Sequence, residues 1–171
     1  DMNVVATPFL PQGAVAANPA SISMTAEGNI LTKTLSLEGT SIGAPGAAIK
    51  ATLADDGVLH ANASTGGVDI ALNSGATLAS ISAGTALSRG DVTITATGDL
   101  IHGSGAGTDV TGNNITLSTT NGSVGSNAAA VNLEARGTML SGGDTVGGVV
   151  NISAQDDINI THAGTLRAGQ I

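Results

Sequence analysis

The sequence predicts an all-β protein whose short strands stack in successive coils, forming a parallel β-solenoid of about 20 residues per coil. Three observations favour this fold class: an aliphatic composition almost without aromatic rings, short runs of alternating apolar and polar residues, and internal repeats. A coil of that length cannot bury its apolar face alone, so coils must stack to form a core. From residue 20 onward the chain has room for seven or eight such coils.

The composition favours a narrow core of small aliphatic side chains. The chain has 171 residues, of which 41% are hydrophobic and 25 are Gly, while Phe9 is its only aromatic residue and Cys is absent. Aromatic rings supply much of the buried area in most compact domains, so a core without them must be filled by Ala, Val, Ile and Leu. The formal net charge of −8 disfavours binding to nucleic acid or to anionic membranes. No run is long and apolar enough for membrane insertion.

Short alternating runs predict strands that bury one face. Residues 68–72, 78–81, 92–94 and 131–133 each place aliphatic residues at every second or third position, with polar or small residues between them. Helices are disfavoured, because no window keeps a helical spacing of apolar residues and Gly interrupts every candidate.

Two kinds of internal repeat support the stacking of coils. Residues 22–30, 92–100 and 150–158 share the pattern aliphatic, polar, aliphatic, polar, Ala, followed by a turn that ends in Asn or Asp. Residues 41–49 likewise match residues 123–131. Both motifs occur in the same order in each half of the chain. The extra residues of the second half lie around residues 103–108 and predict a loop on one coil.

The repeats divide the chain into two parts. Residues 1–19 hold Phe9 and three of the four prolines but no repeat, so we interpret them as a linker or an irregular cap over the first coil. Residues 20–171 form the predicted solenoid. Because the end at Ile171 carries no capping sequence, we expect the natural chain to continue, and we expect any export signal to lie outside this segment.

The Ala-x-Gly-Asp-Leu pattern at residues 96–100 and the Gly-Ser-Val-Gly pattern at residues 122–125 resemble the repeat region of filamentous haemagglutinin-type exoproteins. These are large adhesins exported by two-partner secretion, and the resemblance covers about residues 20–171. It implies a right-handed parallel β-helix that is secreted or held at the bacterial cell surface. The family's Asn-Pro-Asn-Gly and Asn-Pro-Asn-Leu secretion motifs are absent, since Ala20 follows Asn18-Pro19. The segment is therefore not the secretion domain.

The resemblance implies a structural function in attachment, aggregation or biofilm formation, without catalysis, cofactor or metal. The implied partners are a host or neighbouring cell surface, matrix polysaccharide, an outer-membrane transporter for export, and other copies of the chain in fibres. Two alternatives stay open. One is a β-helical enzyme that degrades polysaccharide, and the other is an autotransporter passenger or glycan-binding module that uses the irregular loop at residues 102–114.

Arg89, Gly90 and Asp91 form an Arg-Gly-Asp tripeptide, a sequence that integrins bind and that some adhesins of this type carry. It precedes the strand that begins at Val92, so we expect it to lie in a turn. The alternative is that the tripeptide arose by chance, because Gly-Asp also precedes a strand at Gly98-Asp99.

Five Asn-x-Ser/Thr sequons are candidate glycosylation sites: Asn62, Asn114, Asn121, Asn151 and Asn159. Some two-partner adhesins are glycosylated at such sites. The alternative is chance, because a chain rich in Asn, Ser and Thr produces sequons freely.

The remaining polar residues predict no catalytic or metal site. Acidic pairs occur at residues 55–56 and 156–157, and Asp157 aligns with Asp99, which favours hydrogen bonds to local backbone at a turn over catalysis. The three histidines, His60, His102 and His162, are dispersed without ligand spacing, so we expect them in exposed positions.

Overall fold

The computed structural model describes residues 2–5, 22, 29–85, 90–103, 105, 107–139, 145–164 and 167–170. Within these residues it contains strands and no helix. The strands are β1 (Met2–Val5), β2 (Ile30–Gly39), β3 (Ile49–Ala63), β4 (Val68–Leu72), β5 (Ala76–Ala83), β6 (Val92–Ala96), β7 (Leu100–His102), β8 (Val110–Gly112), β9 (Ile115–Thr119), β10 (Val131–Ala135), β11 (Thr138–Met139), β12 (Thr145–Val146), β13 (Val149–Ser153), β14 (Ile160–His162) and β15 (Arg167–Ala168).

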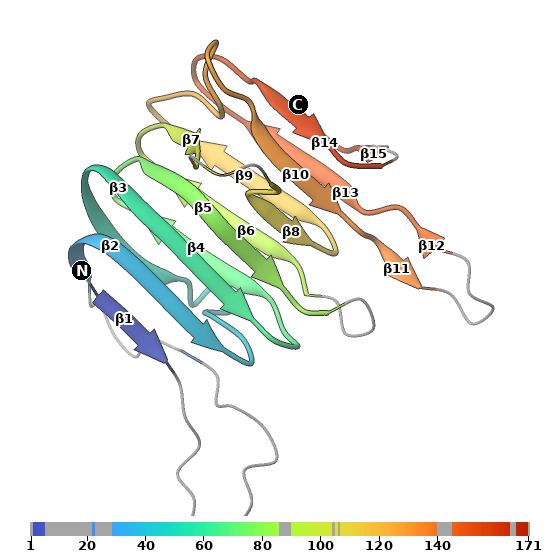
Figure 1. The fold of residues 1–171 in the computed structure, drawn as a ribbon, viewed down its shortest axis with the longest axis horizontal. Coiled ribbons are helices and arrows are strands. Elements are labelled where there is room, and N and C mark those ends of the chain that lie inside the picture. The colour runs from blue at the N-terminus through green and yellow to red at the C-terminus, as the bar shows by residue number, and fades with distance from the viewer. Residues whose placement is uncertain are drawn as a thin grey trace, which may run out of the picture.

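Thirteen of these strands form one parallel sheet that coils into a β-solenoid of about four turns, with roughly 24 residues per turn. Figure 1 shows the turns advancing from β1 at one end to β14 and β15 at the other. The predicted fold class is confirmed. The expectation of seven or eight coils of about 20 residues is too high, because a turn takes roughly 24 residues and insertions lengthen single coils further, as between the paired residues Ile115 and Val150.

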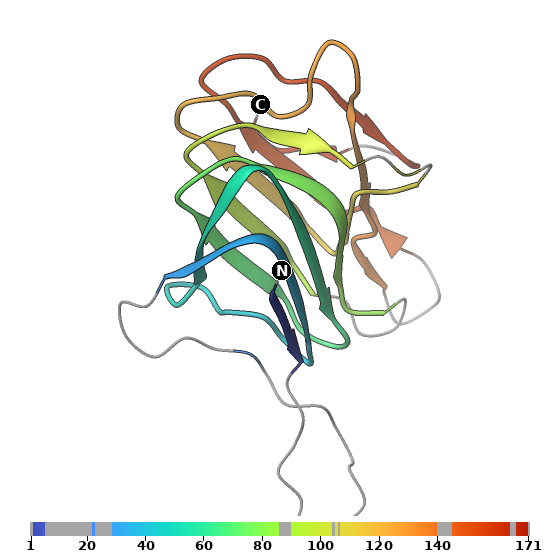
Figure 2. The ribbon, with the colours of Figure 1, turned by 60° about the vertical axis from the view of Figure 1, so that its left-hand side comes forward.

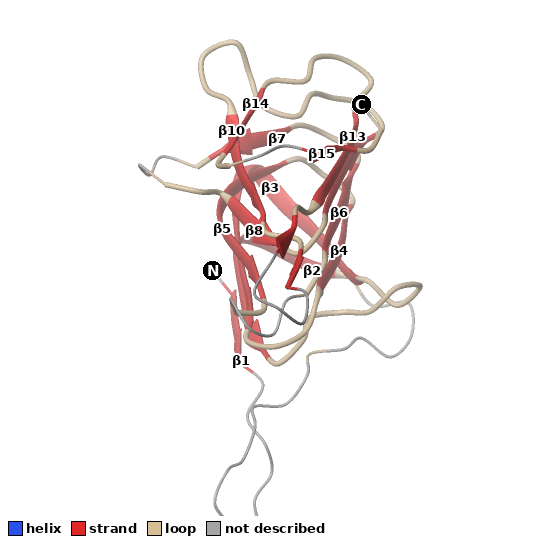
Figure 3. Cartoon of the chain, turned by 90° about the vertical axis from the view of Figure 1, so that its right-hand side faces the viewer, coloured by secondary structure: helices blue, strands red, loops and turns tan. Residues whose placement is uncertain are grey.

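Two walls of stacked strands face each other across the core. One wall stacks β4, β6, β9 and β13, with Val68 opposite Val92, Val92 opposite Ile115 and Ile115 opposite Val150. The other stacks the later part of β3 with β5, β8 and β10. Figure 2 shows the chain winding from one wall to the other, and Figure 3 shows the walls edge-on.

The core between the walls is aliphatic along its length. Every buried apolar residue in the described part of the chain is Ala, Val, Ile or Leu, as the composition predicts. In β4, β9 and β10, buried and partly exposed residues alternate, which matches the period-2 pattern in the sequence. The largest fully buried side chains are Leu35, Leu37, Ile42, Ile49, Leu59, Ile70, Leu78, Ile94, Leu100, Ile115, Leu117 and Leu133.

The first repeat motif marks equivalent positions of different coils. Its first residues, Ile22, Val92 and Val150, all lie in the stack that runs through β4, β6 and β9. A residue pattern that recurs along the chain therefore returns to the same wall of the solenoid.

The second repeat motif forms a local outward excursion of the backbone. Ile42 and Ile49 pair with Val68 and Ile70, so six residues, 43–48, stand where the next coil has only Asp69. We call residues 43–48 the first excursion. The second excursion, residues 125–130, is built alike on another part of the solenoid, where Val124 and Val131 pair with Ile158 and Ile160.

Two further segments lengthen individual coils. The loop predicted at residues 103–108 is confirmed as an insertion, because Leu78 pairs with His102 but Ile81 pairs with Val110. The antiparallel hairpin of β11 and β12 projects from the later coils and has no counterpart in the sequence prediction.

Within residues 1–19, Met2–Val5 forms β1, which pairs in parallel with β2. Phe9 and the three prolines lie outside the described residues.

Candidate functional site

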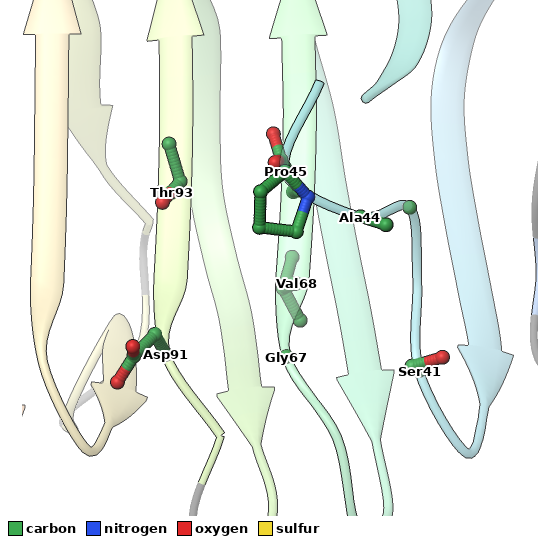
Figure 4. Close-up of a pocket in the computed structure, with 9 residues that line it drawn as sticks. Ser41, Ala44, Pro45, Gly67, Val68, Asp91 and Thr93 are labelled. Carbon is green, nitrogen blue, oxygen red and sulfur yellow. The ribbon is translucent and has the colours of Figure 1, made fainter. Parts of the chain in front are cut away.

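A depression of about 350 Å³ lies on the outer surface of β4 and β6, beneath the first excursion. Three successive coils contribute to it, and Figure 4 shows Pro45 of the excursion lying over β4, with Thr93 on β6 and Asp91 directly before that strand. Among the described residues that line the depression, two are acidic and none is basic. The depression is lined by Ser41, Gly43, Ala44, Pro45, Gly67, Val68, Asp69, Asp91 and Thr93.

The first excursion is held on β4 by its glycine. Gly43 has φ +66°, and a Cβ atom added there would lie 2.2 Å from the carbonyl oxygen of Asp69. The Asp69 N–H donates to the Ile42 carbonyl at 2.7 Å, and Ala44 and Ala47 exchange backbone hydrogen bonds of 3.2 and 2.7 Å. Only glycine allows this left-handed turn to lie so close to the neighbouring coil.

Asp69 lies under the excursion, and its carboxylate has no hydrogen-bond partner within the described part of the chain. Burial raises the pKa of this carboxyl above its ordinary value of 3.8, because partial removal from water disfavours the charged form. The Asp69 carboxyl therefore holds its proton to a higher pH than a fully exposed aspartate does.

The raised pKa of Asp69 predicts a pH dependence of stability. The folded state binds a proton more readily here than the unfolded state, so the stability that protonation contributes is complete below about pH 3.8 and is lost as pH rises through the folded pKa. We expect Asp69→Asn to gain stability relative to the native chain between acidic and neutral pH. Urea denaturation across that range measures the difference, which solvent screening keeps small.

The control for this prediction is Asp157→Asn, which removes the same charge from a residue that is exposed. An identical pH dependence in the two variants would show that the burial of Asp69 has no influence on folding.

Asp91, the third residue of the Arg-Gly-Asp tripeptide, uses its carboxylate to join two coils. Its Oδ1 accepts hydrogen bonds from the side-chain amides of Asn113 and Asn114 and from the Asn114 backbone, at 2.9, 3.0 and 3.1 Å. Gly90 is buried, and a Cβ there would lie 1.9 Å from the Gly66 carbonyl oxygen. Arg89 lies outside the described residues. The geometry of Gly90 and Asp91 thus serves the coil stack, and receptor binding by the tripeptide stays a prediction.

Asp91→Ala is expected to lower the free energy of unfolding by about 1–2 kcal/mol, because several N–H donors lose one shared, solvent-accessible acceptor. Chemical denaturation of the two proteins measures the loss. Asp157→Ala is the matched control, since this exposed carboxylate makes no side-chain hydrogen bond to the described residues, and its expected change is within about 0.5 kcal/mol. Equal losses in both variants would refute a stabilising role for the Asp91 carboxylate.

The structure divides the five sequons into two groups. The amides of Asn114, Asn151 and Asn159 are used between coils: they accept from the backbone of Val149 and Gln170, or donate to the Ser126 carbonyl. Asn62 and Asn121 are exposed on the surface. Because a glycan is attached through Nδ2, it would meet no contact between coils on Asn62 or Asn121, whereas it would replace a donor hydrogen on Asn114, which donates to Asp91, and on Asn159, which donates to the Ser126 carbonyl.

A buried polar network around Asp109 closes the 103–108 insertion. The Asp109 side chain is only 4% exposed, and its Oδ2 lies 2.8 Å from His102 Nδ1 and accepts the Asn132 backbone N–H at 2.8 Å. Its Oδ1 accepts the Gly103 N–H at 3.3 Å, and Asn132 donates to the Gly107 carbonyl at 3.0 Å. The expectation of exposed histidines is wrong: His60 and His162 are only partly exposed, and the His102 side chain is 19% exposed and lies against Asp109.

The acidic turn residues act between neighbouring coils. The Asp99 carboxylate accepts the Ser123 N–H at 2.7 Å, and the Asp157 N–H donates to the Ser123 hydroxyl at 3.2 Å. The predicted hydrogen bond from a turn carboxylate to backbone is thus present at Asp99, whereas Asp157 contributes its backbone N–H and its carboxylate has no partner among the described residues. The side chains of residues 55–56 lie outside the described part of the chain.

Among the residues that the structure describes, no three His, Asp or Glu side chains are grouped to hold a metal ion, and no helix could span a bilayer.

Comparison of the chain with models of protein families, with curated proteins and with solved structures gave no match. The geometry of the described residues is therefore the basis for a function.

Proposed function

We propose that this chain is a rod segment of a large secreted bacterial surface protein of the filamentous haemagglutinin type. In this proposal its function is mechanical: it extends, spaces and joins surfaces in attachment, aggregation or the biofilm matrix. The proposal includes no catalytic step and no cofactor.

One observation carries the proposal, namely that several outward polar side chains form hydrogen bonds between neighbouring coils. Asp91, Asp99 and Asn114 each accept or donate hydrogen bonds to a residue about one coil away in the sequence. The aliphatic core continues beneath them from coil to coil. A chain built this way gains stability from repetition, so its length can be increased without a new core.

The partners follow from the proposed role. Export of an extended solenoid would use an outer-membrane transporter, and the exposed polar walls would contact host or neighbouring cells, matrix polysaccharide or further copies of the chain. These walls are acidic overall, with a formal charge of −8 for the chain, so we expect contacts to be made through hydrogen bonds or through basic partners.

The test is to couple the purified chain to beads, and to measure bead aggregation and retention on bacterial and epithelial cells, with electron microscopy of the same sample. We expect slender particles and retention above that of beads carrying an unrelated acidic protein. Arg89→Ala in parallel reports whether the tripeptide contributes. Particles that neither aggregate nor bind any surface would overturn the proposal.

A polysaccharide-cleaving site at the depression is the second candidate, favoured by Asp69 and Asp91 together. Glycoside hydrolysis uses two carboxyl groups of which one, the acid, has a raised pKa, as burial gives Asp69. Against this alternative, none of the described lining residues is basic, and Asp91 Oδ1 already accepts three N–H donors. Release of reducing sugar ends that Asp69→Asn abolishes would establish this alternative and replace the structural proposal.

A further inference from the structure

The turn at Asn121-Gly122 joins β9 to the second excursion and differs from the other asparagine sites of the solenoid. Asn121 is exposed, and its side chain makes no hydrogen bond to any described residue. Gly122 is anchored through its carbonyl oxygen, which accepts the Thr119 hydroxyl at 2.6 Å and the Asp156 N–H at 3.3 Å. Its own N–H donates to no group in the described part of the chain.

This combination leaves free the two groups that must react when an asparagine loses its amide. The side-chain carbonyl carbon of Asn121 is unrestrained, and the nitrogen that would attack it belongs to a residue without a Cβ, so ring closure meets the least steric hindrance. We propose that Asn121 is a site of spontaneous deamidation in the folded chain, an inference that does not depend on the proposed function.

The reaction needs only water. The Gly122 backbone nitrogen loses its proton and bonds to Cγ of Asn121, while the bond from Cγ to Nδ2 breaks and ammonia leaves. Water then opens the resulting succinimide at either carbonyl, giving aspartate or the β-linked isoaspartate. The net change replaces the side-chain NH2 by OH and adds one negative charge at neutral pH.

Neighbouring asparagines lack this freedom. Asn113 donates its amide to Asp91, and the backbone nitrogen that would attack it, that of Asn114, donates to the same carboxylate at 3.1 Å. Asn127 is exposed like Asn121 but is followed by Ala128, whose Cβ hinders ring closure. Asn127 is therefore the matched internal control.

The new charge would arise beside an existing acidic group. A Cβ at Gly122 would lie 2.5 Å from Asp99 Oδ1, and that carboxylate already accepts the Ser123 N–H. Deamidation would thus add a negative charge at the residue before Gly122, the glycine that packs against Asp99, in the turn that positions Val124 for its pairing with Leu100 and Ile158.

The experiment incubates the folded native chain at mildly alkaline pH and follows each asparagine by peptide mass mapping, with isoelectric focusing for the charge change. We expect loss of the amide at Asn121 first, ahead of Asn127, and an acidic shift that the Asn121→Gln variant does not show. A parallel sample in urea gives the rate for the unfolded chain. Equal rates at Asn121 and Asn127 in the folded sample, or loss at Asn121 only in urea, would overturn the proposal.

Discussion

Replacing Asp109 by alanine is expected to lower the free energy of unfolding by about 3–5 kcal/mol, because it removes the shared acceptor of a buried hydrogen-bond network. Three N–H groups, from His102, Gly103 and Asn132, point at this carboxylate. Without it, the backbone donors have no acceptor in a place that water hardly reaches, and the 103–108 insertion loses its closure. Urea denaturation followed by circular dichroism measures the change.

Asp99→Ala is the control for that substitution, because Asp99 also accepts a backbone N–H from the next coil but is exposed. Its expected cost is about 1 kcal/mol, since water can replace the carboxylate. If Asp109→Ala cost no more than Asp99→Ala, the burial of the network would contribute nothing, and the loop would be held by other contacts.

Gly43→Ala is expected to cost roughly 3 kcal/mol, from the left-handed backbone and from a collision between coils. The added Cβ would lie 2.2 Å from the Asp69 carbonyl oxygen, so the excursion and β4 would have to separate. The same argument applies to Gly125, where φ is +80° and the Asn159 carbonyl oxygen would be 1.9 Å away. Thermal or urea denaturation of both variants measures the effect.

Gly46→Ala separates the two contributions, because Gly46 has φ +80° in the same excursion but no atom within 4 Å of the added Cβ. It retains the backbone strain alone, about 1 kcal/mol. Similar losses at Gly43 and Gly46 would mean that the collision is relieved at little cost, and that the excursion is not fixed on the neighbouring coil.

The walls of the solenoid were predictable from the sequence, because a strand with one buried face alternates apolar residues that point inward with polar or small residues that point outward. β4 and β6 alternate aliphatic and polar residues, and Val92 and Val150 open matching motifs on the same wall. The coil length was less predictable. Motif spacing reports neighbouring strands as well as successive coils, and only the pairing of Val68 with Val92 fixes the advance at 24 residues.

The hydrogen-bond network of Asp109 could not be predicted from the sequence, because its residues come together only when the chain coils. His102 and Asn132 lie 30 residues apart, on strands whose adjacency depends on the length of every intervening corner. The one feature of the sequence that could have indicated the network is Asp109 itself, an isolated acidic residue directly before the apolar residue at which β8 begins. The role of Asp91 in joining two coils was likewise not predictable. The Arg-Gly-Asp motif concerns three consecutive residues, whereas the hydrogen-bond partners of Asp91, Asn113 and Asn114, belong to the next coil.

The excursions show how such a chain can diversify. In each, six residues occupy the place of one, yet the flanking residues, such as Ile42 and Ile49, keep their pairing with the neighbouring coil. The length of the segment between them thus does not alter the pairing of the strands, and a Cβ atom added at Gly46, within this segment, would meet no atom within 4 Å. Foreign peptides grafted there would be displayed at a fixed height and orientation on one wall, and natural variants could exchange these tips while inheriting the same scaffold.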